Sequence, residues 1–353
     1  MKYEQEGLAL ATTVDLDIEK KAGFELMHKG KVRETYSLGK EKSGQENYLI
    51  VTTDRISVFD FVLSNPIPGK GIVLSQISNM LMRMFGNIVP NHLIETNVEN
   101  FPQRLAPWKN VLRNRAVIVK KLHMLPVEDI VRGNLGGSVW KDYLAGKPVG
   151  GHALAPGMKL WQKLPQPIYT PSTKAEAGAH DENITRDSAQ DILKNDFGFD
   201  DAMVAFHEAT ALNLFAGIRD YAAACGVAML DTKFEFGLDA LSGELTLGDE
   251  CGTPDSSRYS TKEAYDVAFA AGKNPDSLDK QPVRDYMEAQ EKAGLWNKSD
   301  MNSVPPALPN EKILETAERY AKAFFAMGAE TFNPGAAKQL EQIMAAARKE
   351  YAR

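Results

Sequence analysis

Cysteine is scarce in this chain of 353 residues, and several other features are missing altogether. The two cysteines, Cys225 and Cys251, lack the spacing of metal ligands, which argues against a structural zinc site and a disulfide framework. No apolar run is long enough to span a bilayer, and the first residues lack the basic start and apolar stretch of a signal peptide. We therefore expect a cytoplasmic protein that does not associate with a membrane.

Blocks of lysine or arginine are also missing. The formal net charge is −6, and the sequence pI is about 5.7. Charge therefore gives no support for a nucleic-acid partner. Hydrophobic residues make up 43% of the chain, which is enough to bury a substantial core. Without any internal repeat, this composition predicts one large domain of two lobes, or two domains.

The spacing of apolar residues predicts a mixture of strands and helices. Residues 124–132 are interpreted as a connector between lobes. Residues 151–186 are rich in proline and glycine, and we expect a long functional loop there. The predicted strands cover residues 24–36, 48–53 and 115–121, and the predicted helices cover residues 73–85, 207–225, 287–293, 311–327 and 336–352.

Two runs of alternating residues, Asp231–Gly237 and Glu244–Glu250, predict a paired hairpin. Strand side chains alternate between faces, so Asp231, Lys233 and Glu235 should share one face, with apolar residues on the other. A metal ion or an anionic ligand would explain such a charged face. A solvated face with cross-strand ion pairs explains it equally well.

The residues that follow favour a binding site. Asp249 would lie on the leucine side of a regular strand, unless a bulge at Gly248 redirects it. Gly252–Arg258 is a polar turn with a proline, an acid, three hydroxyls and an arginine. Such a turn is suited to binding phosphate or carboxylate oxygens.

Three further motifs are weaker when taken alone. Gly30–Arg33 brings two cations close to a glycine and could meet a polyphosphate, although an exposed lysine and arginine on a hairpin are more common. Thr53–Ser57 contains an acid and an arginine that could equally form an ion pair at a turn. Val131–Trp140 joins an arginine to a glycine-rich turn and Ser138, which suits phosphate or a helix N-cap. His180 is a possible general base, although lone histidines are more often structural.

Taken in order, these motifs resemble the SAICAR synthetase family from about residue 24 to residue 290. Several long motifs in one order are far more specific than any one of them. The motifs that carry the resemblance are Gly30-Lys-Val-Arg, Thr53-Asp-Arg-Ile-Ser, Val131-Arg-Gly, Thr170-Pro-Ser-Thr-Lys-Ala-Glu, His180-Asp-Glu-Asn-Ile, Asp231-Thr-Lys-Phe-Glu-Phe-Gly, Thr253-Pro-Asp-Ser-Ser-Arg and Asp279-Lys-Gln.

The resemblance implies a two-lobed α+β fold related to ATP-grasp enzymes and protein kinases. An antiparallel N-terminal sheet would form an ATP-binding lobe over residues 1–122, and a larger α+β lobe over residues 123–294 would bind substrate and metal. Residues 295–353 would form a helical extension that packs on the body. The chain would be a monomer or a homodimer.

The resemblance also implies an ATP-dependent ligase of purine biosynthesis. Such an enzyme joins L-aspartate to a carboxyaminoimidazole ribonucleotide and releases the succinocarboxamide, ADP and phosphate. An acyl phosphate is the expected intermediate, and the loop from Thr170 to Asn183 is expected to exclude water from it.

Residue roles follow from the same resemblance. Glu235 and Asp249 would bind Mg²⁺, and Lys233, Asp231 and His180 would serve catalysis, the last two as candidate bases. The residues expected to bind ATP are Gly30, Lys31, Arg33, Lys120 and Met124. The residues expected to bind the other substrates are Asp54, Arg55, Arg132, Ser138, Lys174, Asp181, Glu182 and Arg258.

Two other functions compete with this hypothesis. A small-molecule kinase would also use ATP and metal-binding carboxylates, but its ADP release would not depend on L-aspartate. A catalytically silent nucleotide-binding protein is a second alternative. The presence of Lys31, Lys233, Glu235, Asp249 and Arg258 argues against it.

Overall fold

The computed structural model describes residues 18–174 and 182–352. The chain divides into two compact units. Unit 1 contains the described residues up to 80, together with residues 93–121 and those from 278 onward. Unit 2 contains residues 81–92 and the described residues from 122 to 277. Each unit has its own sheet, and the two are described in turn.

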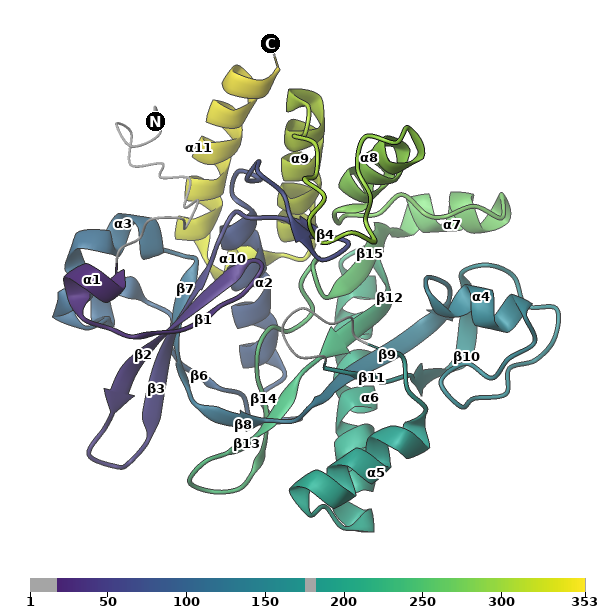
Figure 1. Cartoon of the computed structure of the whole chain (residues 1–353), viewed down its shortest axis with the longest axis horizontal. Coiled ribbons are helices and arrows are strands. Elements are labelled where there is room, and N and C mark those ends of the chain that lie inside the picture. Colours follow the sequence, from purple (N-terminus) through teal and green to yellow (C-terminus); the bar gives the residue numbers. More distant parts are fainter. Residues whose placement is uncertain (1–17, 175–181, 353) are drawn as a thin grey trace. The chain divides into compact units, whose positions relative to one another are not determined.

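Unit 1 is built on a five-stranded antiparallel sheet with the strand order β1-β2-β3-β7-β6 (Figure 1). Its inner side chains, among them Tyr36, Leu49, Val51 and Ile118, form an apolar core with the N-terminal helix. A short hairpin, β4–β5, follows the third strand. The strands are β1 (Leu26–Lys29), β2 (Arg33–Lys40), β3 (Glu46–Thr52), β4 (Ser57–Val58), β5 (Phe61–Val62), β6 (Leu93–Glu95) and β7 (Ala116–Lys120).

The C-terminal helices belong to unit 1 and pack on the rest of it. Asn333 connects them to it, because its side-chain nitrogen donates to Gln76 Oε1 at 2.8 Å and to Asn114 Oδ1 at 3.1 Å. The amphipathic α9 and α11 also contact each other. The helices of this part are α1 (Ile18–Ala22), α2 (Lys70–Met84), η3 (Val98–Asn100), η4 (Gln103–Trp108), α3 (Lys109–Leu112), α8 (Gln281–Lys292), α9 (Asn310–Ala326), α10 (Ala329–Phe332) and α11 (Pro334–Tyr351).

Unit 2 contains a sheet with the strand order β10-β9-β12-β15, and the short β11 also pairs with β9. A three-stranded sheet, β14-β13-β8, lies in the same unit. Neighbouring strands in both sheets are antiparallel. The strands are β8 (Leu122–Met124), β9 (Val127–Leu135), β10 (Gln162–Tyr169), β11 (Ser172–Thr173), β12 (Val227–Phe234), β13 (Phe236–Asp239), β14 (Leu245–Leu247) and β15 (Ser257–Thr261).

The long helix α6 (Asp201–Ala224) packs against β12, β10 and β9 (Figure 1). Its buried residues, including Ala211, Leu214, Phe215 and Ile218, recur at spacings of three and four, which places them on one face. Burying each large apolar side chain contributes roughly 1.5–3 kcal/mol. The other helices of this unit are α4 (Val139–Leu144), α5 (Arg186–Phe197) and α7 (Lys262–Ala270).

Several predictions from the sequence need correction. Residues 124–132 lie mostly in β8 and β9, so they are strands rather than a connector. The predicted loop at residues 151–186 contains β10 and β11. Asp231–Phe234 belongs to β12 of the four-stranded sheet, and the hairpin with β14 begins only at Phe236. Helix α6 begins at residue 201, before the predicted start, because the Asp200 side chain caps it.

The α+β class and the antiparallel N-terminal sheet are confirmed. Within the parts of the chain that the structure describes, no helix is both long enough and apolar enough to cross a bilayer.

Candidate functional site

Strand β12 carries the acidic and basic residues that the sequence predicts to act together. Asp231 and Lys233 lie two positions apart in the strand, and Glu235 follows its last residue. Residues at this spacing share one face of a strand. Their neighbours come from β9 and β15, because both strands pair with β12. Two groups of polar contacts result, and both lie within unit 2.

We call the first group the arginine cluster. Asp231 Oδ2 accepts a hydrogen bond from Arg132 Nη1 at 3.0 Å and also pairs with Arg258 Nη1. Arg132 donates from Nε to Thr170 Oγ1 at 2.9 Å and from Nη2 to Ser138 Oγ at 3.3 Å. Two guanidinium groups therefore share one carboxylate and leave the cluster with a net positive charge. Guanidinium groups offer pairs of parallel donors, which match the oxygens of a phosphate.

Gly137 allows the guanidinium of Arg258 to lie against the backbone. Its φ is +67°, and a Cβ atom at this position would be 2.5 Å from Arg258 Nη1. On another side, Arg258 Cζ lies 5.6 Å from the ring centroid of Trp161. The Arg258 side chain is still 30% exposed. The guanidinium is thus held in place while part of it stays open to an incoming anion.

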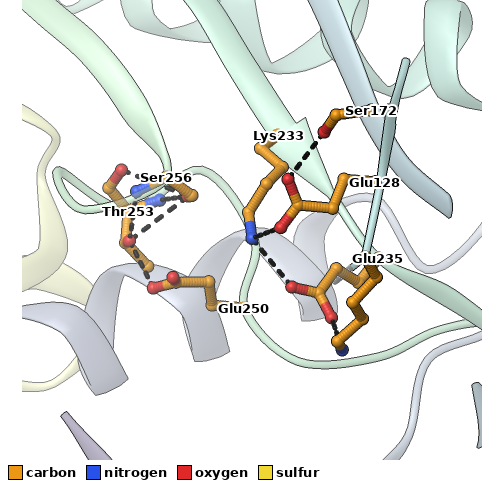
Figure 2. A network of polar contacts seen from close by, with 8 residues as sticks. Glu128, Ser172, Lys233, Glu235, Glu250, Thr253 and Ser256 are labelled. Atoms are coloured by element: carbon orange, nitrogen blue, oxygen red, sulfur yellow. Dashed lines mark hydrogen bonds and ion pairs between the residues drawn. The ribbon is translucent and has the colours of Figure 1, made fainter. Parts of the chain in front are cut away.

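We call the second group the lysine–glutamate ladder; it consists of Lys174, Glu235, Lys233, Glu128 and Ser172. Figure 2 shows Lys233 between the carboxylates of Glu128 and Glu235. Lys233 Nζ is 2.9 Å from Glu235 Oε1 and also pairs with Glu128 Oε1. Glu235 Oε2 pairs with Lys174 Nζ, and Glu128 Oε2 accepts from Ser172 Oγ at 2.8 Å. Both carboxylates therefore have a partner on each oxygen.

The ladder fixes the protonation states of its two central groups. Burial alone would raise the pKa of Glu235, but the charges of Lys233 and Lys174 outweigh it and lower the pKa to about 2. Burial alone would lower the pKa of Lys233, but the charges of Glu235, Glu128 and Asp249 raise it instead. Near neutral pH the first is a carboxylate and the second an ammonium. Lys233 can therefore bind an anion but cannot serve as a base.

Asp249 leaves the regular strand just after β14. Its φ is +50°, which is a left-handed backbone conformation. The preceding Gly248 donates its backbone N–H to the carbonyl of Glu235 at 2.9 Å. The charge of Asp249 also contributes to the raised pKa of Lys233, so this carboxylate acts on the ladder. An irregular backbone at Gly248–Asp249 thus replaces the regular strand that would have placed Asp249 with the leucines.

The polar turn before β15 is held by its own side chains. Thr253 Oγ1 donates to Glu250 Oε2 at 2.5 Å and accepts from the backbone N–H of Asp255 at 3.2 Å. Figure 2 shows Thr253, Glu250 and Ser256 together. The carbonyl of Ser256 accepts from the backbone N–H of Lys233 at 2.9 Å. The turn therefore fixes where β15 begins and where it presents Arg258.

In unit 1, Arg55 holds the turn that contains the predicted ATP-binding residues. Its Nη2 and Nε donate to the carbonyls of Gly30 at 2.9 Å and Lys31 at 3.0 Å. Its Nη1 lies 2.8 Å from Glu34 Oε1. The turn is closed by the backbone N–H of Gly30, which donates to the carbonyl of Arg33 at 2.8 Å. Arg55 is only 9% exposed, so its guanidinium supports the turn from inside the protein.

Two other residues of unit 1 differ sharply in exposure. Asp54 is fully buried, where its Oδ1 accepts from the backbone N–H of Gly71 at 2.8 Å and lies 3.1 Å from Arg115 Nη1. The side chain of Lys31 is 53% exposed and pairs with Asp60. Lys31 can therefore meet a ligand without rearrangement of the core, whereas Asp54 is placed to anchor the start of α2.

The remaining candidates lie at strand ends or near β11. Lys120 is the last residue of β7 in unit 1, and Met124 is the last residue of β8 in unit 2, opposite Gly237. Glu182 is exposed, and its backbone N–H donates to Thr173 Oγ1 at 3.2 Å. His180 and Asp181, and part of the loop expected to exclude water, lie outside the described residues.

The chemistry of the ladder fits a hard divalent cation. Glu235 is ionised and Asp249 supplies a second carboxylate, and oxygen ligands of this kind are those that Mg²⁺ prefers. Within the described ranges, no three His, Cys, Asp or Glu side chains meet in a group that could hold a metal. Mg²⁺ commonly completes its shell with water and substrate phosphates, so two carboxylates suffice for such a site.

Three residues of these two groups were not identified as functional from the sequence. Glu128 and Ser172 complete the ladder, and Thr170 orients Arg132. The sequence of Val127–Arg132 does hold a pattern that could have identified Glu128. Glu128 and Arg132 lie four positions apart, so both would face the same side of a strand. Interpreting this segment as a connector removed that signal.

Comparison with known proteins gives one family. A model of the family described as SAICAR synthetase matches residues 26–299. The phosphoribosylaminoimidazole-succinocarboxamide synthase of Syntrophotalea carbinolica is 45% identical over 302 residues, which cover 86% of this chain and 94% of that protein.

Solved structures agree with this match. A SAICAR synthase of Saccharomyces cerevisiae, described as complexed with SAICAR, has a TM-score of 0.73 and 33% identity, and the match covers 90% of this chain and 98% of that chain. Another SAICAR synthetase structure, described as in complex with ADP, has a TM-score of 0.57 and 22% identity over 86% of this chain and 97% of that chain. The second likeness concerns the fold alone.

Proposed function

The chain belongs to the SAICAR synthetase family, and from this premise we propose how the two groups on β12 divide the work of the family reaction. That reaction joins L-aspartate to the carboxyaminoimidazole ribonucleotide with ATP and yields SAICAR, ADP and phosphate in purine biosynthesis. The arginine cluster binds the phosphate of the ribonucleotide. The lysine–glutamate ladder binds the metal ion and the carboxylate that reacts.

The arginine cluster supports the first role through its charge. Arg132 and Arg258 both pair with Asp231, so one positive charge stays uncompensated among these three groups. Ser138 adds a hydroxyl beside Arg132. The observation that carries the proposal is that two guanidinium groups share the carboxylate of Asp231, which lies two residues before Lys233 in the strand.

The ladder supports the second role. Lys233 is an ammonium that two carboxylates hold in place, and it pairs with the carboxylate of the imidazole when the ribonucleotide binds. Glu235 and Asp249 would hold Mg²⁺, which would supply positive charge against the phosphates of ATP during phosphoryl transfer.

The chemistry proceeds through an acyl phosphate. An oxygen of the imidazole carboxylate attacks the γ-phosphorus of ATP, the bond to the β-phosphate oxygen breaks, and ADP leaves. The amine of L-aspartate then attacks the activated carbonyl carbon, and phosphate leaves with the electron pair of the broken bond. Without this activation, a carboxylate oxygen is too poor a leaving group for amide formation.

The amine must lose a proton before or during its attack. Lys233 stays protonated because its pKa is raised, so it does not accept this proton. Asp231 is a candidate acceptor through its second oxygen, because Oδ2 already pairs with both arginines. His180 is the other candidate.

Gly30, Lys31 and Arg33 of unit 1 bind the phosphates of ATP. For the adenine, the candidates are Lys120 at the end of β7 and Met124 at the end of β8. Arg55 and Asp54 are expected from the resemblance to bind substrate, but both are buried, and their proposed role is instead to hold the Gly30–Arg33 turn and the start of α2. Lys174, Asp181 and Glu182 bind the other substrates.

Product analysis tests this function. Purified protein is supplied with Mg-ATP and the carboxyaminoimidazole ribonucleotide, with and without L-aspartate, while ADP release and the mass of SAICAR are followed. We expect ADP and SAICAR in equal amounts, and neither without L-aspartate. Full-rate ADP release without L-aspartate would point to a kinase, and ATP binding without turnover would point to a silent nucleotide-binding protein.

A further inference from the structure

Lys174 and Lys233 both place an ammonium on the same carboxylate, that of Glu235, but they are held very differently. Lys233 is on a central strand, and its Nζ has a second carboxylate partner in Glu128. The only ion pair of Lys174 among the described contacts is with Glu235. The side chain of Lys174 is 43% exposed, compared with 29% for Lys233. Of the two ammonium groups, that of Lys174 is therefore the easier to displace.

The backbone of Lys174 stays in place when its side chain moves. Its N–H donates to the carbonyl of Pro126 at 3.1 Å, and the preceding β11 pairs with β9 through Ser172 and Glu128. Ser172 also donates its hydroxyl to the Glu128 carboxylate at 2.8 Å. Removing the ammonium from Glu235 thus needs only rotation about side-chain bonds.

A divalent cation held by Glu235 would compete with the Lys174 ammonium for this carboxylate. It would take lone pairs of the carboxylate and repel an ammonium group nearby. Glu235 Oε2, the oxygen paired with Lys174, is the one that can be freed without disturbing Lys233. We infer that Lys174 occupies Glu235 until the metal binds, and that its release then provides an ammonium for a carboxylate of L-aspartate. The inference rests on the proposed role of Glu235 as a metal ligand.

The competition makes an unusual prediction, which is that removing a positive charge tightens binding of the metal. The probe is Mn²⁺ in the presence of excess ADP, so that the Mn²⁺ is carried by the nucleotide, and the bound fraction is measured by electron paramagnetic resonance. Lys174→Met should bind Mn-ADP about fivefold more tightly than the wild type, on the scale of a partly exposed ion pair. The affinity for ADP in EDTA should not change.

Two matched variants isolate the effect. Lys174→Arg keeps the positive charge and should keep the wild-type affinity for Mn-ADP. Lys262→Met removes a lysine that pairs with Asp266 on the exposed face of α7, and it should change neither affinity. In the steady state, Lys174→Met should raise the KM for L-aspartate, whereas Lys262→Met should not.

The outcomes separate this inference from the assignment of the metal site. Glu235→Gln should lower the affinity for Mn-ADP to that for ADP alone. If it does not, the assignment of Glu235 as a metal ligand is wrong. If Glu235→Gln weakens Mn-ADP binding but Lys174→Met leaves it unchanged or weaker, the competition is overturned. An unchanged KM for L-aspartate in Lys174→Met would overturn the role of the released ammonium.

Discussion

The arginine cluster and the lysine–glutamate ladder lie on the same strand but differ in sign of charge. In the arginine cluster, two guanidinium groups and the carboxylate of Asp231 leave a net formal charge of +1. In the ladder, Lys174 and Lys233 meet Glu128 and Glu235, and the nearby Asp249 brings the net formal charge to −1. The first group is therefore suited to a phosphate, and the second to a cation, with the Lys233 ammonium beside it for a carboxylate.

This difference shows how one strand can serve two opposite ligands. Alternation places Asp231 and Lys233 on one face, so the two groups are neighbours by necessity. The two groups differ because β9 places a different residue beside each side chain. Arg132 of β9 lies opposite Asp231 in the register, whereas Glu128 of the same strand reaches Lys233. A strand rich in both signs is thus divided into two sites by its neighbours.

The largest expected effect comes from removing a charge of the ladder. Glu235→Gln keeps the size of the side chain but removes the charge that balances two lysines and that we propose binds the metal. We expect kcat to fall by about 10³-fold or more, because phosphoryl transfer depends on that metal. Thermal unfolding checks that the variant is folded. A kcat within about tenfold of the wild type would refute the metal assignment.

A smaller effect is expected from a substitution that displaces Arg258 in the arginine cluster but removes no charged group. Gly137→Ala adds a Cβ atom 2.5 Å from Arg258 Nη1 at a φ of +67°. Gly146→Ala is the matched control, since its φ is +69° and nothing lies within 4 Å of the added atom. Gly137→Ala should raise the KM for the ribonucleotide about tenfold, the scale of one perturbed charged hydrogen bond.

Both alanine variants carry the same backbone strain, so comparable losses of stability are expected from them. Only Gly137→Ala should affect the ribonucleotide, and the KM values for ATP and L-aspartate serve as internal references. Equal KM values for the ribonucleotide in the two variants would show that the position of Arg258 is not critical.

The smallest effect on activity is expected behind the sheet, at a buried pair outside both groups. His207 Nε2 on α6 lies 3.2 Å from Asp129 Oδ1, and Tyr169 donates to the same oxygen at 2.6 Å. Burial alone would lower the pKa of His207, but the charges of Asp129 and Glu208 raise it above 6.5. The pair therefore stabilises the fold fully below pH 6.5, and this contribution is lost as pH rises through the raised pKa.

His207→Gln tests that pair. The difference in Tm between wild type and variant should be largest below pH 6.5 and should shrink above it. Activity per folded molecule should stay within about threefold, because the substituted side chain touches neither group of the site. A Tm difference that does not vary between pH 5 and pH 9 would show that folding does not shift the pKa of His207, and a difference that shrinks below pH 6.5 would show that the buried side chain is uncharged.

Local sequence patterns were sufficient for much of the fold and of the site. The alternation in Asp231–Glu235 indicated one charged face, and the polar turn at Gly252–Arg258 indicated an anion site, because both depend on neighbours within a few residues. The terminal helices were also predictable, since α9 and α11 each have a marked apolar face. Their packing with unit 1 was not, because it depends on tertiary contacts such as those of Asn333.

Other features depend on partners that are distant in the sequence. Arg132 and Asp231 are 99 residues apart, so their pairing could be seen only in the sheet. Strand β10 contains Pro165 and Pro167, which cannot donate to a strand partner, and it was interpreted as a loop for that reason. It lies at the edge of its sheet, where such residues are tolerated, and its register with β9 shifts in this part.

The division of β12 into an anion site and a cation site can be tested by one calorimetric titration. The carboxyaminoimidazole ribonucleotide is titrated, without metal, into wild type, Arg258→Gln and Glu235→Gln. Our prediction is that Arg258→Gln weakens binding about 30-fold or more, while Glu235→Gln stays within about threefold of wild type. Equal losses in the two variants, or a loss only in Glu235→Gln, would contradict it.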